Sequence, residues 1–372
     1  VNNTDGTCTA NITNNLSNRN LIINGAMQVA QRGTSSTSAG YGTVDRINFQ
    51  YSGTDEAPTQ AQVDVASGTT PYTLGFRKAY KITNGNQTSG AGVNDFINFQ
   101  IKLEAQDVAN SGWNYTSSSS FITLSFYIKS SVAQTFKGYL RAVDGTSQQY
   151  PFETGSLSAD TWTKITKTVS GNSNIQIDND NGVGFQINIG AFWGTSYSAN
   201  SVTEDAWSAF ASSSRVKDST STWYTTNDAT FEITGVQLEV GSVATDFEHR
   251  SFGQELALCQ RYYYVHVDGT THSSSIEAIG TGTWYNGSEF YTAIPFPTTM
   301  RSVPSLEQTS GSSYYYQNNA GGGGAFNDFS ALWYGSPNMA FLSKTGSSGT
   351  QGASAMVRTG STSAKLAFKS EL

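Results

Sequence analysis

One stretch, Gly235–Tyr264, constrains the fold more than any other because its residue periodicity changes halfway. Apolar and polar residues alternate over Ile233–Val240, as they do in a strand with one buried face. Ser251 and Gln254 then form a capping box, which is typical of a helix start. The apolar residues that follow recur at helical spacing and predict one buried stripe, formed by Phe252, Leu256, Cys259 and Tyr263. The stretch therefore predicts a strand that runs into a short helix, at the joint between two β-rich regions.

Strand-like runs separated by turn signals fill the chain before this joint. Phe121–Lys129 (FITLSFYIK) shows the pattern best, because Ile122, Leu124, Phe126 and Ile128 all fall on one face. The other clear runs are Ile47–Tyr51, Ala61–Val65, Gly75–Ile82, Phe96–Leu103, Gln134–Val143, Thr161–Val169, Gly184–Phe192 and Ala229–Val240. Roughly eight to ten strands with little helix predict an all-β jelly-roll β-sandwich.

Two other segments of this region carry weaker signals. Leu21–Ile23 and Met27–Val29, joined by Asn24-Gly25, predict two short strands around a turn. The chain is irregular over residues 195–226, where Glu204–Ser212 favours a short helix. A loop of this length in a domain is usually functional or packed on itself.

Shorter strand-like runs follow the joint and predict a second, smaller β-sandwich. The four-glycine run Gly321–Gly324 predicts a flexible loop tip within it. The predicted organisation is a polar arm over residues 1–20, a jelly roll over 21–249, a linker helix over 250–264 and a C-terminal β-sandwich over 265–372.

The composition limits the function. Charged residues make up 13% of the chain, against about 25% in an average globular protein, while aromatics reach 12%. A net charge of −7 with no basic run argues against a nucleic-acid partner. No apolar run is long enough to insert into a membrane. A neutral-polar, aromatic-rich chain fits an extracellular or virion protein.

No residue pattern predicts catalysis. His249 lies in the joint, where a structural hydrogen bond is expected rather than a catalytic triad. Glu204 and Asp205 are the strongest carboxylate pair, and nothing in the sequence marks them as an acid/base pair. The chain is therefore predicted not to be an enzyme.

The run Asp178-Asn179-Asp180-Asn181-Gly182 has two interpretations. Its density of oxygen ligands is similar to the start of a calcium loop, with Asp178 and Asp180 as metal ligands, but the distal Glu of such loops is absent. A tight turn held by Asp side chains explains the same residues. A structural calcium ion is the one cofactor that the sequence leaves open.

Aromatic residues concentrate in the C-terminal region. Three consecutive tyrosines on a strand must turn at least one ring outward, because successive side chains point to opposite faces. Outward rings serve a subunit interface or stack on sugars. The predicted glycan-binding residues are Trp284, Tyr285, Tyr314, Tyr315, Tyr316, Trp333 and Tyr334.

The chain resembles one family in three places. That family is the bacteriophage tail-fibre or virion attachment proteins, in which a carbohydrate-module-like jelly roll precedes a C-terminal β domain. The joint resembles it most, although Asp246 stands where the family often has Pro. The resembling segments are Asn20–Arg32 (NLIINGAMQVAQR) followed by Val44–Arg46, the joint Gly235–Tyr264, and the end of the chain from Ile294 to Phe368–Leu372 (FKSEL).

The resemblance implies a structural virion protein that attaches a phage to glycans on its host. It implies a homotrimer displayed outside the cell, on the phage tail or outer surface, with the arm over residues 1–20 contacting other tail or capsid proteins. A capsid decoration protein or head fibre is one alternative, and a glycan-degrading tailspike is another. A secreted bacterial carbohydrate-binding protein is a fourth interpretation.

Overall fold

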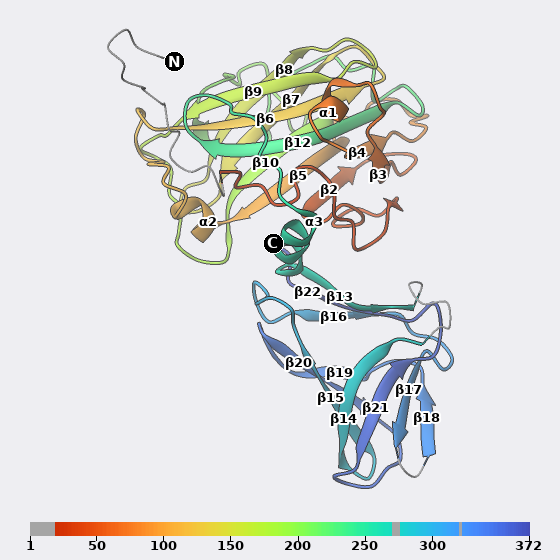
Figure 1. Ribbon diagram of the computed structural model, residues 1–372. Helices are drawn as coiled ribbons and strands as arrows, with labels where there is room; N and C mark the ends of the chain where they lie inside the picture. The colour runs from red at the N-terminus through yellow and green to blue at the C-terminus, as the bar shows by residue number, and fades with distance from the viewer. Residues whose placement is uncertain (1–18, 270–275, 320–321) are drawn as a thin grey trace, which may run out of the picture.

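A computed structural model describes residues 19–269, 276–319 and 322–372 of the chain. A large β-sandwich is followed by the helix α3 (Phe252–Gln260) and a second group of β-sheets (Figure 1). The C-terminus does not lie at the far end of this arrangement but returns beside α3. None of the helices within the described ranges has the length and apolar character to cross a membrane. The predicted all-β architecture is confirmed.

The N-terminal sandwich consists of two six-stranded antiparallel sheets. The first has the order β1 (Ser35–Ser36), β3 (Thr59–Asp64), β4 (Lys78–Thr83), β12 (Thr230–Val240), β6 (Phe121–Ser130) and β9 (Thr163–Ser170). The second has the order β11 (Ser208–Ala209), β8 (Gln148–Ser156), β7 (Thr135–Ala142), β10 (Val183–Trp193), β5 (Phe96–Glu104) and β2 (Ile47–Ser52). Two short helices, α1 (Thr70–Thr73) and α2 (Ala105–Ala109), lie in the connections.

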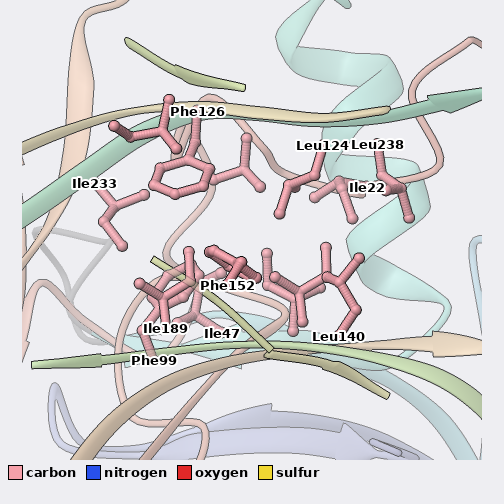
Figure 2. Packing of buried hydrophobic residues seen from close by; sticks show 14 of the residues in the cluster. Ile22, Ile47, Phe99, Leu124, Phe126, Leu140, Phe152, Ile189, Ile233 and Leu238 are labelled. Carbon is pink, nitrogen blue, oxygen red and sulfur yellow. The ribbon is translucent and has the colours of Figure 1, made fainter. Parts of the chain in front are cut away.

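Alternating residues of the two sheets form the core of the sandwich. Figure 2 shows Leu124 and Phe126 from one sheet facing Phe99 and Ile189 from the other. The aliphatic face predicted for β6 is confirmed, since its four apolar residues are fully buried. Packing of the inner faces leaves the alternate residues of each strand pointing outward.

Three predictions for this region are wrong in detail. Leu21–Ile23 and Met27–Val29 are not strands, although Leu21 N donates to Leu238 O of β12 at 2.9 Å. Glu204–Ser212 is not a helix, because β11 within it pairs with β8 and Glu204 forms an ion pair with Lys137 at 2.8 Å. β8 has no counterpart among the predicted runs, since Pro151 and neighbouring polar residues hide its strand pattern.

The C-terminal region contains a three-stranded and a seven-stranded antiparallel sheet. The smaller has the order β13 (Tyr263–Asp268), β22 (Lys365–Lys369) and β16 (Ser305–Gln308). The larger has the order β18 (Gly322–Phe326), β17 (Tyr315–Asn319), β21 (Ser354–Thr359), β14 (Ala278–Asn286), β15 (Glu289–Pro295), β20 (Met339–Thr345) and β19 (Ala331–Ser336). The predicted loop tip at the glycine run is wrong, because its last three glycines belong to β18 and pair with β17.

Helix α3 begins as predicted, but its buried side differs in part from the prediction. Ser251 Oγ accepts from Gln254 N at 3.3 Å, which confirms the capping box. The predicted apolar stripe is confirmed for Cys259 and Tyr263, which are fully buried, and wrong for Phe252, which is 56% exposed; Glu255 is the other buried residue of the helix. Glu255 accepts a hydrogen bond from Asn24 N and lies 3.6 Å from Arg250, so a polar contact, not an apolar one, anchors the helix.

Buried ionic contacts join the two regions. Glu104 on β5 is fully buried and accepts from both Nε and Nη2 of Arg261, at 2.7 and 2.8 Å. Glu371, near the C-terminus, forms ion pairs with Arg32 and Arg46 of the first region. His249 makes the structural hydrogen bond predicted for it, from Nε2 to Leu74 O at 2.8 Å. The contacts of Glu104 and Glu371 thus join the C-terminal region to the sandwich.

Candidate functional site

The outward face of the second sheet of the sandwich is lined by amides. On β5 the inner residues Ile97 and Phe99 alternate with Asn98 and Gln100. The same alternation places Gln186 and Asn188 of β10, and Asn48 and Gln50 of β2, on the outer face. Three neighbouring strands therefore present six amide side chains on one surface.

Strand register brings these amides into a hydrogen-bonded network. Gln50 pairs with Asn98, and Gln100 pairs with Asn188. Gln50 Nε2 donates to Gln100 Oε1 at 3.1 Å, and Gln100 Nε2 donates to Asn188 Oδ1 at 2.9 Å. Asn98 Nδ2 donates to both Asn188 Oδ1 and Gln50 Oε1, at 3.0 and 3.2 Å. Because Asn98 and Asn188 are fully buried, they fix the head groups of Gln50 and Gln100 that lie above them.

A groove of about 550 Å³ runs over this network. Amides, aromatic rings and cations line it. Its principal side chains are Asn48, Gln50, Gln100, Gln186, Tyr51, Phe96, Tyr139, Phe210, Lys102, Arg141 and Arg215. Its volume is within the range of about 300–1,000 Å³ typical of small-molecule sites.

One wall of the groove comes from the irregular stretch after β10. Phe210 N donates to Ser147 O at 2.8 Å, which holds this stretch beside β8. The guanidinium of Arg141 lies 3.7 Å from the centre of the Phe210 ring. Arg215 N donates to Tyr197 O at 2.8 Å and so fixes the second part of the wall. The irregular stretch over residues 195–226, which was predicted to be functional or packed on itself, thus packs over the outer face of the sheet.

The side chains of the groove are suited to binding a polar ligand. The described residues that line it include no Asp, Glu, His or Cys; its titratable side chains are tyrosines, one lysine and two arginines. Burial raises the pKa of Tyr139, against the opposing effects of Arg215 and Arg141, so its hydroxyl stays protonated at neutral pH. Each amide head keeps donor and acceptor capacity beyond its bonds within the network. Such groups read hydroxyls, while the flanking rings can stack on the apolar faces of a sugar.

Two of the residues predicted to bind glycans are in the core of the C-terminal region. Trp284 is 1% exposed and packs edge-on against Phe290, with ring centres 5.5 Å apart. Tyr315 is fully buried, and its hydroxyl donates to Lys365 O at 2.7 Å. The prediction is wrong for both, because strand alternation turns their rings inward, where no ligand can reach them.

The other predicted residues lie at or near the surface. Tyr285, Trp333 and Tyr334 are 65%, 53% and 65% exposed. They share the outward side of the large sheet with half-buried Tyr291 and exposed Phe341, and we call these five residues the distal face. The remaining predicted residues are half-buried: Tyr314 packs against the core of the C-terminal region, and the Tyr316 ring lies 4.4 Å from the guanidinium of Arg358.

Asp178 and Asp180 lie in an exposed turn. Asp180 Oδ1 accepts from Gly182 N at 2.9 Å, which confirms the turn predicted for this run. Asp178 N donates to Asp144 Oδ2 at 2.9 Å. Within the described ranges, no three or more His, Cys, Asp or Glu residues are grouped as a metal site. Calcium binding by Asp178 and Asp180 stays a prediction.

The amide groove was not predicted, although the sequence contains a signal for it. The tetrapeptide Ile-Asn-Phe-Gln occurs twice, at residues 47–50 and 97–100. The two copies lie side by side on β2 and β5, with Phe49 opposite Phe99 and Asn48 opposite Gln100. A strand in which amides alternate with apolar residues indicates an outer face built from amides, in contrast to the mixed charged and polar residues of an ordinary solvent-exposed face.

Comparison with known proteins finds distant likeness to several solved structures. No protein-family model and no curated protein matches the chain. Among solved structures, the enzymatically active domain of tailspike protein 4 from bacteriophage CBA120 has a TM-score of 0.32 at 10% identity. That match covers 60% of this chain and 22% of the tailspike chain, so this chain spans under a quarter of it.

Several carbohydrate-binding proteins are similar at the same level. A putative sugar binding protein from Bacteroides thetaiotaomicron has a TM-score of 0.29 at 15% identity, covering 60% of this chain and 100% of that one. The family 11 carbohydrate-binding module from Clostridium thermocellum, in complex with a β-1,3-1,4-mixed-linked tetrasaccharide, has a TM-score of 0.27 at 9% identity. It covers 57% of this chain and 98% of the module.

Proposed function

We propose that this chain is a glycan-binding protein that attaches a phage virion to its host. The observation that carries the glycan-binding part is the amide network, in which buried Asn98 and Asn188 hold Gln50 and Gln100, two residues that line the groove. A hydroxyl-rich ligand needs several donors and acceptors whose positions are fixed before it arrives. This network supplies them, and the ring of Phe210 supplies an apolar surface in the lining of the groove.

The role in a virion is supported by the family resemblance of the joint and of the two ends of the chain. A fibre protein binds repeated glycans weakly at each site and gains strength through several copies. We therefore propose a homotrimer, whose mass under native conditions tests it; a clean monomer contradicts it. The proposed contact with other virion proteins through residues 1–20 falls largely on residues 1–18, which lie outside the described residues.

The alternatives differ in measurable ways. Antibody labelling of virions places the protein on the tail for an attachment fibre and on the capsid for a decoration protein or head fibre. Release of reducing ends from host envelope polysaccharide would support a tailspike. We propose that the chain is not an enzyme and releases none.

The distal face is a second candidate surface for glycans. Tyr285, Trp333 and Tyr334 are exposed there, as a stacking surface requires. The groove is the stronger candidate, since it combines rings with oriented amides.

Binding to an array of oligosaccharides, using the full chain, tests the proposal. Gln100→Ala and Phe210→Ala each remove one groove contact, and we expect each to weaken binding by about tenfold. Tyr285→Ala and Tyr334→Ala are the matched controls on the distal face and should bind as the wild type does. If the distal variants lose binding and the groove variants keep it, the groove is not the site. Absence of binding to any glycan would contradict the function itself.

Calcium has a separate test. If the turn at Asp178 and Asp180 binds a structural calcium ion, EDTA lowers the melting temperature of the wild type. Asp180→Asn retains the acceptor for Gly182 N, and should remove this EDTA effect. A melting temperature that EDTA leaves unchanged identifies the run as a turn alone.

A further inference from the structure

We propose that the groove binds an anionic glycan, with a carboxylate or phosphate group of the sugar held between Arg141 and Arg215. This inference rests on the proposed glycan-binding function and specifies the class of ligand. It is carried by the charges of the groove, by the packing of the two guanidinium groups and by their lack of carboxylate partners.

The groove has the opposite charge to the chain as a whole. The net charge of the protein is −7, yet the charged residues lining the groove are Lys102, Arg141 and Arg215. The ammonium group of Lys102 donates to Leu372 O at 2.7 Å, so the end of the chain already engages it. The two arginines are therefore the cations available to a ligand.

Arg141 is held in place but incompletely bonded. Its guanidinium lies 3.7 Å from the centre of the Phe210 ring, and Nη2 donates to Ser147 Oγ at 3.2 Å. Nε is buried and has no hydrogen-bond partner in the described structure. Burial lowers the pKa of Arg141; nearby Tyr139 opposes this effect, and Arg215 adds to it. An arginine stays charged in such a site, so an anion beside it would relieve this cost.

Arg215 is positioned in a similar way from the other side. Its guanidinium lies 4.6 Å from the centre of the Tyr197 ring, and Nε donates to Ser212 O at 3.1 Å. The aromatic ring fixes the plane of the group, and the side chain also forms a hydrogen bond with Tyr139 of the groove. A planar guanidinium edge matches the oxygens of a carboxylate or a phosphate.

Three other arginines show how a guanidinium group is paired elsewhere in this chain. Arg261 lies 2.7 Å from Glu104, Arg32 lies 3.0 Å from Glu371, and Arg250 lies 3.4 Å from Glu248. Within the described ranges, neither Arg141 nor Arg215 has a carboxylate within 4.0 Å. Two adjacent, part-buried cations without an acidic partner indicate that the partner comes from the ligand.

Matched pairs of glycans test the inference, because each pair differs only in charge. The probes are trigalacturonate against its methyl ester, 3′-sialyllactose against lactose, and mannose 6-phosphate against mannose. We expect the wild type to prefer the charged member of at least one pair by roughly ten- to a hundredfold. The first two pairs report a carboxylate, and the third reports a phosphate. Raising the salt concentration should weaken the charged member only.

Arg141→Gln and Arg215→Gln should each remove most of this preference while retaining binding of the neutral member. Arg77→Gln is the matched control, since Arg77 is exposed, stacks on Tyr72 at 3.9 Å and lies outside the groove. Arg141→Lys keeps the charge and should retain part of the preference. Thermal unfolding identifies any variant that has lost its fold.

The outcomes separate this inference from the proposed function. Equal binding of charged and neutral members, lost in Gln100→Ala but not in Arg141→Gln, overturns the anionic ligand and leaves glycan binding intact. A charge preference that both arginine variants keep also overturns it. No binding of any probe or array glycan overturns the proposed function, and this inference with it.

Discussion

The groove and the distal face both lie on the outward sides of antiparallel sheets, yet they are built differently. In the groove, buried Asn98 and Asn188 orient the amides of Gln50 and Gln100. The distal face consists mainly of aromatic rings that contact one another. Oriented polar groups distinguish a selective site from an exposed apolar surface.

The arrangement of rings on the distal face supports this distinction. Tyr285 and Tyr291 meet at an interplanar angle of 86°, as do Trp333 and Tyr334. Rings packed edge to face do not form a flat platform for a sugar. The Tyr291 hydroxyl donates to Glu289 at 3.0 Å, so its proton is already used in a hydrogen bond within the protein. Aromatic content alone therefore does not locate a binding site.

The largest effect on stability is expected for Trp284, and its neighbour Tyr285 on the opposite side of β14 should show almost none. Trp284→Ala removes a buried side chain, and we expect it to reduce the free energy of unfolding of the C-terminal region by about 3–5 kcal/mol. Tyr285→Ala removes an exposed ring and should change it by at most about 0.5 kcal/mol. Denaturant unfolding measures both. Similar losses in the two variants would contradict the assignment of faces.

The amide network gives the next effect. Asn188→Ala removes the acceptor shared by Asn98 and Gln100, and we expect a loss of about 1–3 kcal/mol in the free energy of unfolding. Glycan affinity should fall as well, because Gln100 loses the contact that orients it. Asn200→Ala is the control at an exposed position. Full affinity in a destabilised Asn188→Ala would mean that the network serves stability alone.

The smallest effect is expected on the distal face. The double variant Tyr285→Ala/Tyr334→Ala removes two exposed rings, so the stability should change by about 1 kcal/mol or less. Affinity for the best glycan of the array should stay within roughly twofold, which is under 0.5 kcal/mol. Titration calorimetry measures this affinity. A loss as large as that of Gln100→Ala would make the distal face an equal partner in recognition.

Much of the architecture followed from local patterns, and the groove did not. The alternation in Phe121–Lys129 and the capping box at Ser251 each involve neighbouring residues, so the sequence carries them directly. The burial of Glu255 on α3 could not be predicted, because its carboxylate is satisfied by Asn24, a residue 231 positions away. Burial of a charged residue depends on such distant partners.

The groove depends even more on residues that are distant in the sequence, so it could not be predicted from local patterns. Arg141 and Arg215 are far apart in the sequence, and only the pairing of β7 and β10, with the wall after β10, brings them to one groove. An overall charge of −7 gives no sign of this local cationic surface. Some of the aromatic residues predicted to bind glycans are buried and others are exposed. A shift of one residue in strand register turns a side chain to the opposite face of the sheet, and the sequence does not fix that register.

A crystal structure of the full chain with its best-binding array oligosaccharide tests the central claim most directly. We predict a sugar ring in the groove, hydrogen-bonded to Gln50 and Gln100 and packed against Phe210. An oligosaccharide bound at Tyr285 and Tyr334, with none in the groove, would contradict the account.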